Sequence, residues 1–225
     1  MDLAGARAAT DQAQATSLTM KVFTYYVPLA GKPQDDELGL IELWKKSWAL
    51  RGWNPVVLDE TDLPDDPVAR KLKRAFKKQP TRLRPGMAYA SFARWLAVAA
   101  RGGGFMCDYD VMNYTFTPHE VGEITVYERH VPCLVSGTAD EFMRICRLFA
   151  DYKADAADRV GWWKCTSDMK VLIRRPEAFT QRRDCAEYFL PGWESAAAVH
   201  FSNFAMKPRG YTPRHLHIES LRPFS

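Results

Sequence analysis

The stretch 85–111, in which a helical pattern passes through three glycines into a short apolar segment, constrains the fold most. Ala, Leu and Trp recur at helical spacing over 85–101, and the glycines at 102–104 are typical of a helix end. The next segment, GFMCDYDV over 104–111, has no polar residue before its first aspartate. Such a run indicates a strand buried on both faces, and strands of this kind belong to parallel sheets that helices cover.

Strand-like and helix-like segments alternate along the chain. Stretches rich in β-branched and aromatic residues predict strands over 20–28, 54–60, 124–138 and 196–206. Amphipathic stretches predict helices over 35–52, 64–79 and 139–154, and 168–185 receives no assignment. This alternation predicts an α/β fold with a mostly parallel central sheet and helices on both faces, which binds ligands at the carboxyl ends of its strands. We expect His215 and His217 to be solvated in a polar C-terminal tail.

Length and composition favour one folded domain. A chain of 225 residues with 47% hydrophobic residues can bury one sizeable core. We expect residues 1–18 to be a polar, alanine-rich, disordered leader and residues 19–225 to form the domain. The formal net charge of +4 is a mild excess spread along the chain, so a nucleic-acid partner is not indicated.

Cysteine usage and hydropathy indicate a reducing, aqueous compartment. The five cysteines form no C-x-x-C pair, so their spacing predicts neither a disulfide framework nor a zinc site. No apolar run approaches the roughly 20 residues that span a bilayer, and the first residues lack the apolar core of a secretory signal. We therefore expect a soluble, cytoplasmic protein without a membrane span.

Asp108 and Asp110 stand where the central strand is expected to end. Side chains alternate between the faces of a strand, so these two would project the same way, with Tyr109 opposite. Neighbouring carboxylates repel each other unless a cation lies beside them, and oxygen ligands select Mg²⁺, Mn²⁺ or Ca²⁺. The pair therefore indicates a metal site. On these residues alone, the alternative is two solvated aspartates in a turn at Asn113.

The context of this pair resembles the GT-A nucleotide-sugar glycosyltransferases that carry a D-x-D motif. In that family a helix with a Ser-Asp pair, an Arg and an aromatic residue leads through a Gly-Gly strand to D-x-D. The residues that carry the resemblance are, in chain order, Ala88, Ser91, Arg94, Trp95, Gly103, Gly104, Phe105, Asp108 and Asp110. One position departs from the pattern: Phe92 stands where the family has an Asp that commonly contacts the donor sugar.

The resemblance implies a GT-A-like fold and a metal-dependent glycosyltransferase. It would move a hexose, with retention, from a nucleotide-sugar donor, a UDP-sugar, to a glycan or protein acceptor. The ion, Mn²⁺ or Mg²⁺, would be held by Asp108, Asp110 and His200. His200 begins an H-F…K-P segment that is similar to one in glycogenin-like retaining enzymes, and there Lys207 would contact the donor diphosphate.

Other donor contacts follow from the same resemblance. Ser91 and Arg94 would lie near the donor, and Arg94 would orient either an aspartate or the donor itself. Asp108 would contact the ion or, through water, the ribose. Tyr25 and Tyr26 end the first expected strand, where the base binds in this fold, and either ring could stack on it. The alternative is that these tyrosines pack in the core.

Asp168 is the candidate catalytic residue because it stands in a polar turn before an apolar segment. It would accept the acceptor proton in an inverting reaction, whereas a retaining reaction would leave it to hold a sugar hydroxyl. Trp162, Trp163 and Trp193 flank this region, and aromatic faces commonly stack on sugar rings. Core packing is the alternative for these tryptophans.

Two other function classes stay open at this stage. A non-catalytic GT-A-like module that binds a nucleotide or glycan is compatible with Phe92. A metal-dependent nucleotidyltransferase also needs paired acids on a parallel sheet, but it usually has a glycine-rich, basic phosphate loop directly after its first strand. Residues 25–37 contain one glycine and one lysine, which disfavours that class.

Overall fold

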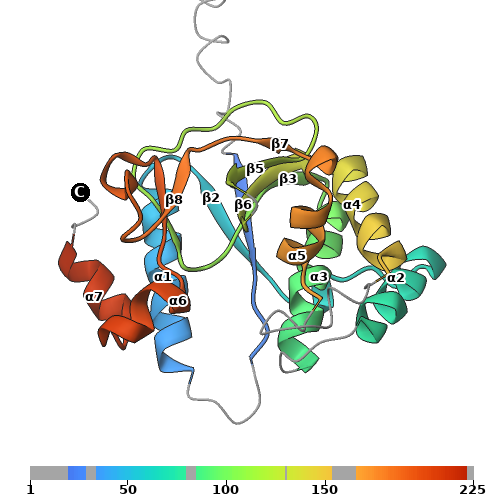
Figure 1. Ribbon diagram of the computed structural model, residues 1–225, viewed down its shortest axis with the longest axis horizontal. Coiled ribbons are helices and arrows are strands. Elements are labelled where there is room, and N and C mark those ends of the chain that lie inside the picture. The colour runs from blue at the N-terminus through green and yellow to red at the C-terminus, as the bar shows by residue number, and fades with distance from the viewer. Residues whose placement is uncertain (1–19, 29–33, 80–84, 130, 154–165, 222–225) are drawn as a thin grey trace, which may run out of the picture.

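The computed structural model describes residues 20–28, 34–79, 85–129, 131–153 and 166–221, and its centre is a six-stranded sheet of order β2-β1-β3-β6-β5-β7 (Figure 1). The strands are β1 (Lys21–Tyr25), β2 (Asn54–Leu58), β3 (Gly103–Cys107), β5 (Thr125–Glu128), β6 (Val131–Thr138) and β7 (Thr180–Gln181). β1 runs parallel to β2 and β3, and β5 runs parallel to β7. Only β6 among these six runs antiparallel to its neighbours, so the mostly parallel sheet is confirmed.

Helices cover both faces of this sheet, as expected. Figure 1 shows α1, α6 and α7 on one side and α2, α3, α4 and α5 on the other. Their bounds are α1 Asp35–Ala49, α2 Pro67–Lys78, α3 Pro85–Ala100, α4 Ala139–Asp151, α5 Asp168–Arg174, α6 Asn203–Met206 and α7 Arg214–Leu221. Short 3-10 turns lie at Glu60–Asp62, Pro176–Ala178, Trp193–Ser195 and Lys207–Arg209. None of the helices in the described residues has the length and apolar character that a membrane crossing requires.

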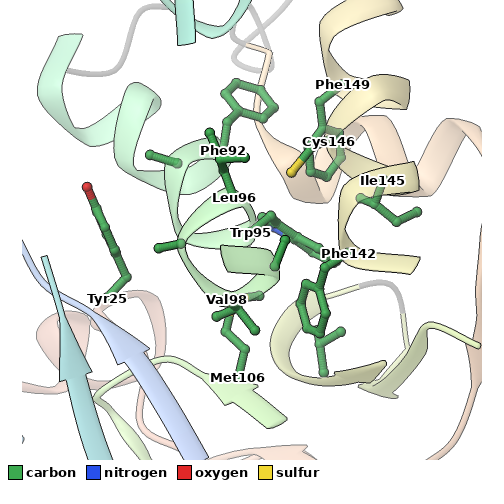
Figure 2. Packing of buried hydrophobic residues seen from close by; sticks show 14 of the residues in the cluster. Tyr25, Phe92, Trp95, Leu96, Val98, Met106, Phe142, Ile145, Cys146 and Phe149 are labelled. Carbon is green, nitrogen blue, oxygen red and sulfur yellow. The ribbon is translucent and has the colours of Figure 1, made fainter. Parts of the chain in front are cut away.

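Alternate residues of the central strands enter two separate cores. Phe23 and Met106 belong to the core beneath α2, α3 and α4, whereas Val22 and Phe105 belong to the core beneath α1. Figure 2 shows the first of these cores, where Trp95 of α3 packs against the α4 residues Phe142 and Phe149 with ring centroids 5.5 and 5.3 Å away. Because both faces are buried, the strands appear in the sequence as continuous apolar runs.

A second sheet of three short strands adjoins the carboxyl end of β3. It consists of β4 (Val111–Asn113), β9 (Ala198–His200) and β8 (Cys185–Glu187), in the order β4-β9-β8. β9 pairs antiparallel with β4 and parallel with β8, so His200 lies opposite Val111 on one side and Glu187 on the other. This sheet therefore connects the region after β3 to two segments that lie far away in the sequence.

The structure corrects several expected elements. The strand expected over 196–206 ends at His200, because the Ser202 side chain accepts the Ala205 backbone N–H and begins α6. The C-terminal stretch with His215 and His217 is not a solvated tail but the helix α7, in which His215 contacts Asp36 at 3.2 Å. The unassigned stretch 168–185 contains α5 and β7. The expected leader, 1–18, lies outside the described residues.

The glycines after α3 allow a testable prediction about the entry into β3. Gly103 has φ +77°, and a Cβ there would lie 2.5 Å from the Ala139 backbone nitrogen, whereas a Cβ on Gly102, with φ +94°, would meet no atom within 4 Å. Gly102→Ala should cost about 1 kcal/mol of unfolding free energy, from the left-handed backbone alone. Gly103→Ala should cost at least about 3 kcal/mol, because the backbone of Ala139 must move as well. Urea unfolding measures both; equal losses would contradict the close approach of β3 to α4.

Candidate metal centre at the end of β3

Asp108 and Asp110 lie in a turn that follows β3. The strand ends at Cys107, and the turn is closed by the Val111 backbone N–H, which donates to the Asp108 carbonyl at 3.0 Å. The expectation that the two aspartates share one face of a strand was therefore wrong. Backbone bonds hold the turn at both ends: Asp108 N–H donates to the Cys133 carbonyl, and Phe201 N–H donates to the Asp110 carbonyl, each at 2.8 Å.

The structure brings Asp108, Asp110 and His200 together. His200 Nε2 lies 3.5 Å from Asp110 Oδ1 and 4.0 Å from Asp108 Oδ2. One ligand atom from each residue falls within 4.8 Å of the other two. The residues come from the turn and from β9, which are 90 positions apart in the chain and are joined by the β4–β9 pairing. Two carboxylate oxygens and an imidazole nitrogen are a donor set that suits Mn²⁺ or Mg²⁺.

An arginine holds the other oxygen of each aspartate. Arg94 Nη1 pairs with Asp108 Oδ1, and Arg214 Nη1 pairs with Asp110 Oδ2 at 2.7 Å. Each carboxylate thus presents one oxygen to a guanidinium and the other toward His200. Arg94 was expected to orient either an aspartate or the donor, and it contacts Asp108; the matching role of Arg214 at Asp110 was not expected. The two guanidinium groups relieve part of the repulsion between the aspartates and fix the orientation of both carboxylates.

Asp168 anchors Arg94. Its Oδ2 accepts from Arg94 Nη2 at 2.6 Å, from Arg94 Nε at 3.1 Å and from Trp95 Nε1 at 3.0 Å, while Oδ1 accepts the Met169 backbone N–H at 2.8 Å. Arg94 Nη2 also donates to the Pro132 carbonyl at 3.0 Å. Burial lowers the pKa of Arg94, but the facing charges of Asp108 and Asp168 outweigh it and raise that pKa. Both oxygens of the candidate catalytic residue are therefore occupied by donors.

Arg214, the first residue of α7, has a comparable anchor on the other side of the sheet. Its side chain is 1% exposed, and its Nε donates to Asp36 Oδ2 at 3.1 Å. Nη1 donates to the Phe201 carbonyl at 3.1 Å as well as to Asp110. Burial raises the pKa of Asp110, but His200 and Arg214 outweigh it, so that pKa is lowered and the carboxylate is ionised at neutral pH.

The second nitrogen of His200 faces two glutamates, of which Glu128 is buried and Glu187 is half-buried. Nδ1 lies 3.1 Å from Glu128 Oε2 and 3.2 Å from Glu187 Oε2. A metal-ligating histidine typically donates its remaining ring N–H to a carboxylate, which fixes the tautomer and leaves the other nitrogen free for the ion. If Nδ1 of His200 donates to Glu128 or Glu187 in this way, Nε2 is free to bind an ion on the side of Asp108 and Asp110. The residues present therefore fit a divalent cation.

Negative charge exceeds positive charge around His200. Within the described part of the chain, six carboxylates contact the guanidiniums of Arg94 and Arg214 or the imidazole of His200; they belong to Asp36, Asp108, Asp110, Glu128, Asp168 and Glu187.

Burial and nearby carboxylates act on the remaining titrating groups. Burial, opposed by Arg94 and reinforced by Asp110, raises the pKa of Asp108 to about 6. Burial lowers the pKa of His200, but the facing acidic groups, Cys133 and Asp110 first, raise it well above its usual range. Because the pKa of the Cys133 thiol is itself raised far above neutrality, we assign this effect on His200 to the carboxylates. The raised pKa of His200 indicates that the cluster attracts positive charge, whereas the raised pKa of Asp108 comes first from burial.

The contacts of the remaining proposed donor residues with a donor stay predictions. Ser91 Oγ donates to the Ala88 carbonyl of its own helix at 2.9 Å. Tyr25 is buried beside α3 in the core of Figure 2, and Tyr26 is half-buried with its ring edge-on to Tyr109 at 5.7 Å. Lys207 is exposed at the start of a 3-10 turn.

Of the three tryptophans considered for sugar stacking, Trp193 lies within the described residues. Its ring packs edge-on against Tyr188, with centroids 4.6 Å apart. Trp162 and Trp163 lie outside the described residues.

Sequence reasoning missed Glu128, Glu187 and Arg214. Glu128 ends the apolar run ITVYE in the same way that Asp108 ends its strand, and that signal could have identified it. Glu187 falls just after the stretch that received no assignment. Arg214 begins a helix that was not predicted, because the polar composition of this stretch indicated a solvated tail. All three reach His200 or Asp110 through tertiary contacts that no local pattern encodes.

Comparison with known proteins yields a distant likeness among solved structures. No family model and no curated protein matches the chain. Among solved structures, a glycosyltransferase involved in the glycosylation of the major capsid of PBCV-1 is similar over 89% of this chain and 99% of that chain, with 11% sequence identity and a TM-score of 0.48. A likeness at this level carries no argument about activity.

The anchoring role of Asp168 predicts a large loss of stability when its charge is removed. Its side chain is 5% exposed and Arg94 is 13% exposed, so Asp168→Asn leaves a buried guanidinium short of one partner and should cost about 3 kcal/mol. Asp65, 77% exposed and paired with Arg70, is the matched control, and Asp65→Asn should cost less than about 1 kcal/mol. Denaturant unfolding of both variants measures the difference. A loss below about 1 kcal/mol for Asp168→Asn would contradict this role.

Proposed function

We propose that the protein is a metal-dependent glycosyltransferase that moves a hexose from a nucleotide-sugar donor, a UDP-sugar, to a glycan or protein acceptor. The observation that carries the proposal is the meeting of Asp108 Oδ2, Asp110 Oδ1 and His200 Nε2 within 4.8 Å of one another. These atoms lie just beyond the carboxyl end of β3, and β1 ends beside it in the same direction. Open α/β sheets bind their ligands at this edge.

The divalent ion, Mn²⁺ or Mg²⁺, would compensate the negative charge that develops on the departing diphosphate. Asp108, Asp110 and His200 would hold it, while Arg94 and Arg214 keep one oxygen of each aspartate turned away from it. Lys207 is exposed at the start of its turn and would reach the diphosphate as a point charge. The Tyr26 ring, which contacts Tyr109 of the D-x-D turn, is the more accessible of the two tyrosines proposed for the base.

The surroundings of Asp168 favour retention over inversion. An inverting transfer needs a carboxylate that is free to take the acceptor proton. Both oxygens of Asp168 already accept hydrogen bonds, from Arg94, Trp95 and Met169. Asp168 would therefore act as a positioning residue that holds Arg94, and through it Asp108, in a retaining reaction.

A second function is supported by one observation about Phe92. This residue is 0% exposed and packs between Phe76 and Phe149, with ring centroids 5.5 and 5.2 Å away (Figure 2 labels Phe92 and Phe149). The position at which the resemblance would place a sugar-binding Asp is thus part of a hydrophobic core. A module that binds a nucleotide sugar without transferring the sugar is the alternative that this favours.

Metal-dependent donor binding tests the site. A panel of UDP-, GDP- and CMP-sugars is screened by thermal unfolding with and without Mn²⁺. At 100 times its Kd, a bound donor adds about 2.7 kcal/mol to stability, which raises the Tm of a chain of this size by about 5–10 °C. We expect this rise with a UDP-sugar only when Mn²⁺ is present. A rise that does not need the ion, or none with any donor, would count against the proposal.

The ligand role of His200 is tested separately. His200→Gln removes the imidazole Nε2 and should weaken Mn²⁺ binding at least about 100-fold, because a ligand itself should matter more than the residues that orient it. His119, half-buried and bonded to Tyr127 at 2.6 Å, is the matched histidine outside the cluster. His119→Gln should bind Mn²⁺ as the unchanged protein does. Calorimetric titration with Mn²⁺ measures both variants, and equal affinities would remove His200 from the site.

Turnover distinguishes the two functions. A transferase that has bound its donor but no acceptor slowly hydrolyses the bond between the sugar and the diphosphate. We therefore expect free sugar and UDP to be released over hours in the presence of Mn²⁺. The Asp110→Asn variant should lose this reaction. Tight, metal-dependent donor binding without any release of sugar would instead support the binding module.

A further inference from the structure

A second group of metal-binding side chains lies behind His200. Cys133 of β6, Cys185 of β8 and Glu128 of β5 each offer one ligand atom, and these atoms lie within 4.8 Å of one another. All three residues are buried, at 0%, 4% and 8% exposure. The mechanism proposed above uses neither thiol. Buried cysteines are usually small apolar residues of a core, whereas these two face a carboxylate.

The separation of the two sulfurs matches a tetrahedral ion. Cys133 Sγ and Cys185 Sγ are 3.8 Å apart. A tetrahedral zinc ion with Zn–S bonds of about 2.3 Å would hold two thiolate sulfurs about 3.8 Å apart. The sulfurs are thus already at the distance that coordination needs. Cys133 Sγ also donates to Glu128 Oε2 at 2.9 Å, which places the third ligand beside the first.

The local backbone directs Glu128 into this group. The pairing of β5 with β6 shifts register between Val126 and Glu128, and such bulges re-aim side chains. Glu128 forms no ion pair with a lysine or arginine in the part of the chain that the structure describes, and its side chain contacts the Cys133 thiol and His200 Nδ1. The imidazole of His200 is shared with Glu187, Asp108 and Asp110, so it compensates the buried Glu128 carboxylate only in part, and coordination to a metal is an arrangement that would offset the remaining cost.

Of the three residues in this group, Glu128 also lines a cavity from which an ion could enter. Glu128 lines a cavity of about 290 Å³ together with Val131, Glu187 and Ala205. Glu187, which is 15% exposed, lies at the same cavity and faces His200 Nδ1. Three protein ligands leave one position of a tetrahedral ion for water from this cavity or for a fourth side chain. Ligand identity, ligand spacing and an entry path are the features by which a metal site is judged.

We propose that Cys133, Cys185 and Glu128 bind a thiophilic divalent cation of the zinc class, at a site separate from the Asp108–Asp110–His200 centre. On binding, each thiol loses its proton to solvent and forms a bond to the ion, so that one dication replaces two protons and the net charge of the buried group is unchanged. No oxidant or reductant is involved. Because Glu128 also faces His200 Nδ1, this ion would fix the orientation of the His200 ring. The proposal does not rest on glycosyl transfer.

Cobalt substitution is the test, because Co²⁺ bound to thiolates gives an intense sulfur-to-metal charge-transfer band that oxygen and nitrogen ligands do not give. The full chain, reduced and freed of metal, is titrated with Co²⁺. We expect the band to saturate at about one ion per chain. Cys133→Ser and Cys185→Ser should each lose most of the band. Cys146→Ser, at a buried cysteine in the other core, should keep it.

A further variant and a second spectroscopic measurement complete the test. Asp110→Asn should keep the band, which separates this site from the D-x-D centre. X-ray absorption on the unchanged protein loaded with zinc should show two sulfur neighbours at about 2.3 Å and needs no variant to fold. Absence of the band in the reduced protein, a band that survives Cys185→Ser, or loss of two titratable thiols to a Cys133–Cys185 disulfide in the native protein would each overturn the proposal.

Discussion

The structure is organised around an excess of negative charge on buried and half-buried carboxylates. Asp108, Asp110, Glu128 and Glu187 surround one imidazole, His200, in a region where water cannot screen them well. Isolated buried carboxylates would take up protons or turn outward. The two aspartates stay in place because Arg94 and Arg214 each pair with one of their oxygens. The two glutamates stay in place because they face the His200 imidazole. The oxygens that remain on the inner side are those that a divalent cation would bind.

Each arginine comes from a different face of the central sheet. Arg94 belongs to α3, and Arg214 belongs to α7 on the opposite side (Figure 1). Their anchors, Asp168 at the start of α5 and Asp36 in α1, belong to the same two layers. The position of the aspartates therefore depends on both hydrophobic cores at once. A site built in this way is rigid, which favours selective binding of an ion with fixed geometry.

The sequence predicted the layers and the central strand, because each rests on a local pattern: the run from the Ala-rich helix through Gly103 to Asp108 contains its own signals. The structure brings Asp108, Asp110 and His200 together, and their binding of a metal ion stays a prediction. It did not predict the turn geometry of Asp108 and Asp110, because their orientation is set by bonds to Cys133 and Phe201 from distant segments. Arg214 escaped notice for a related reason. Its helix is short and lacks a clear apolar stripe in the sequence, and the contacts of its guanidinium with Asp36 and Asp110 form only in the folded chain.

The account depends on a cation among Asp108, Asp110 and His200, and a crystal structure with Mn²⁺ and UDP tests this most directly. Anomalous scattering from manganese is expected to give a peak bonded to Asp108 Oδ2, Asp110 Oδ1 and His200 Nε2, with the diphosphate on its open side and both arginine pairs intact. A crystal that contains UDP and manganese but shows no peak between these three atoms would contradict the account.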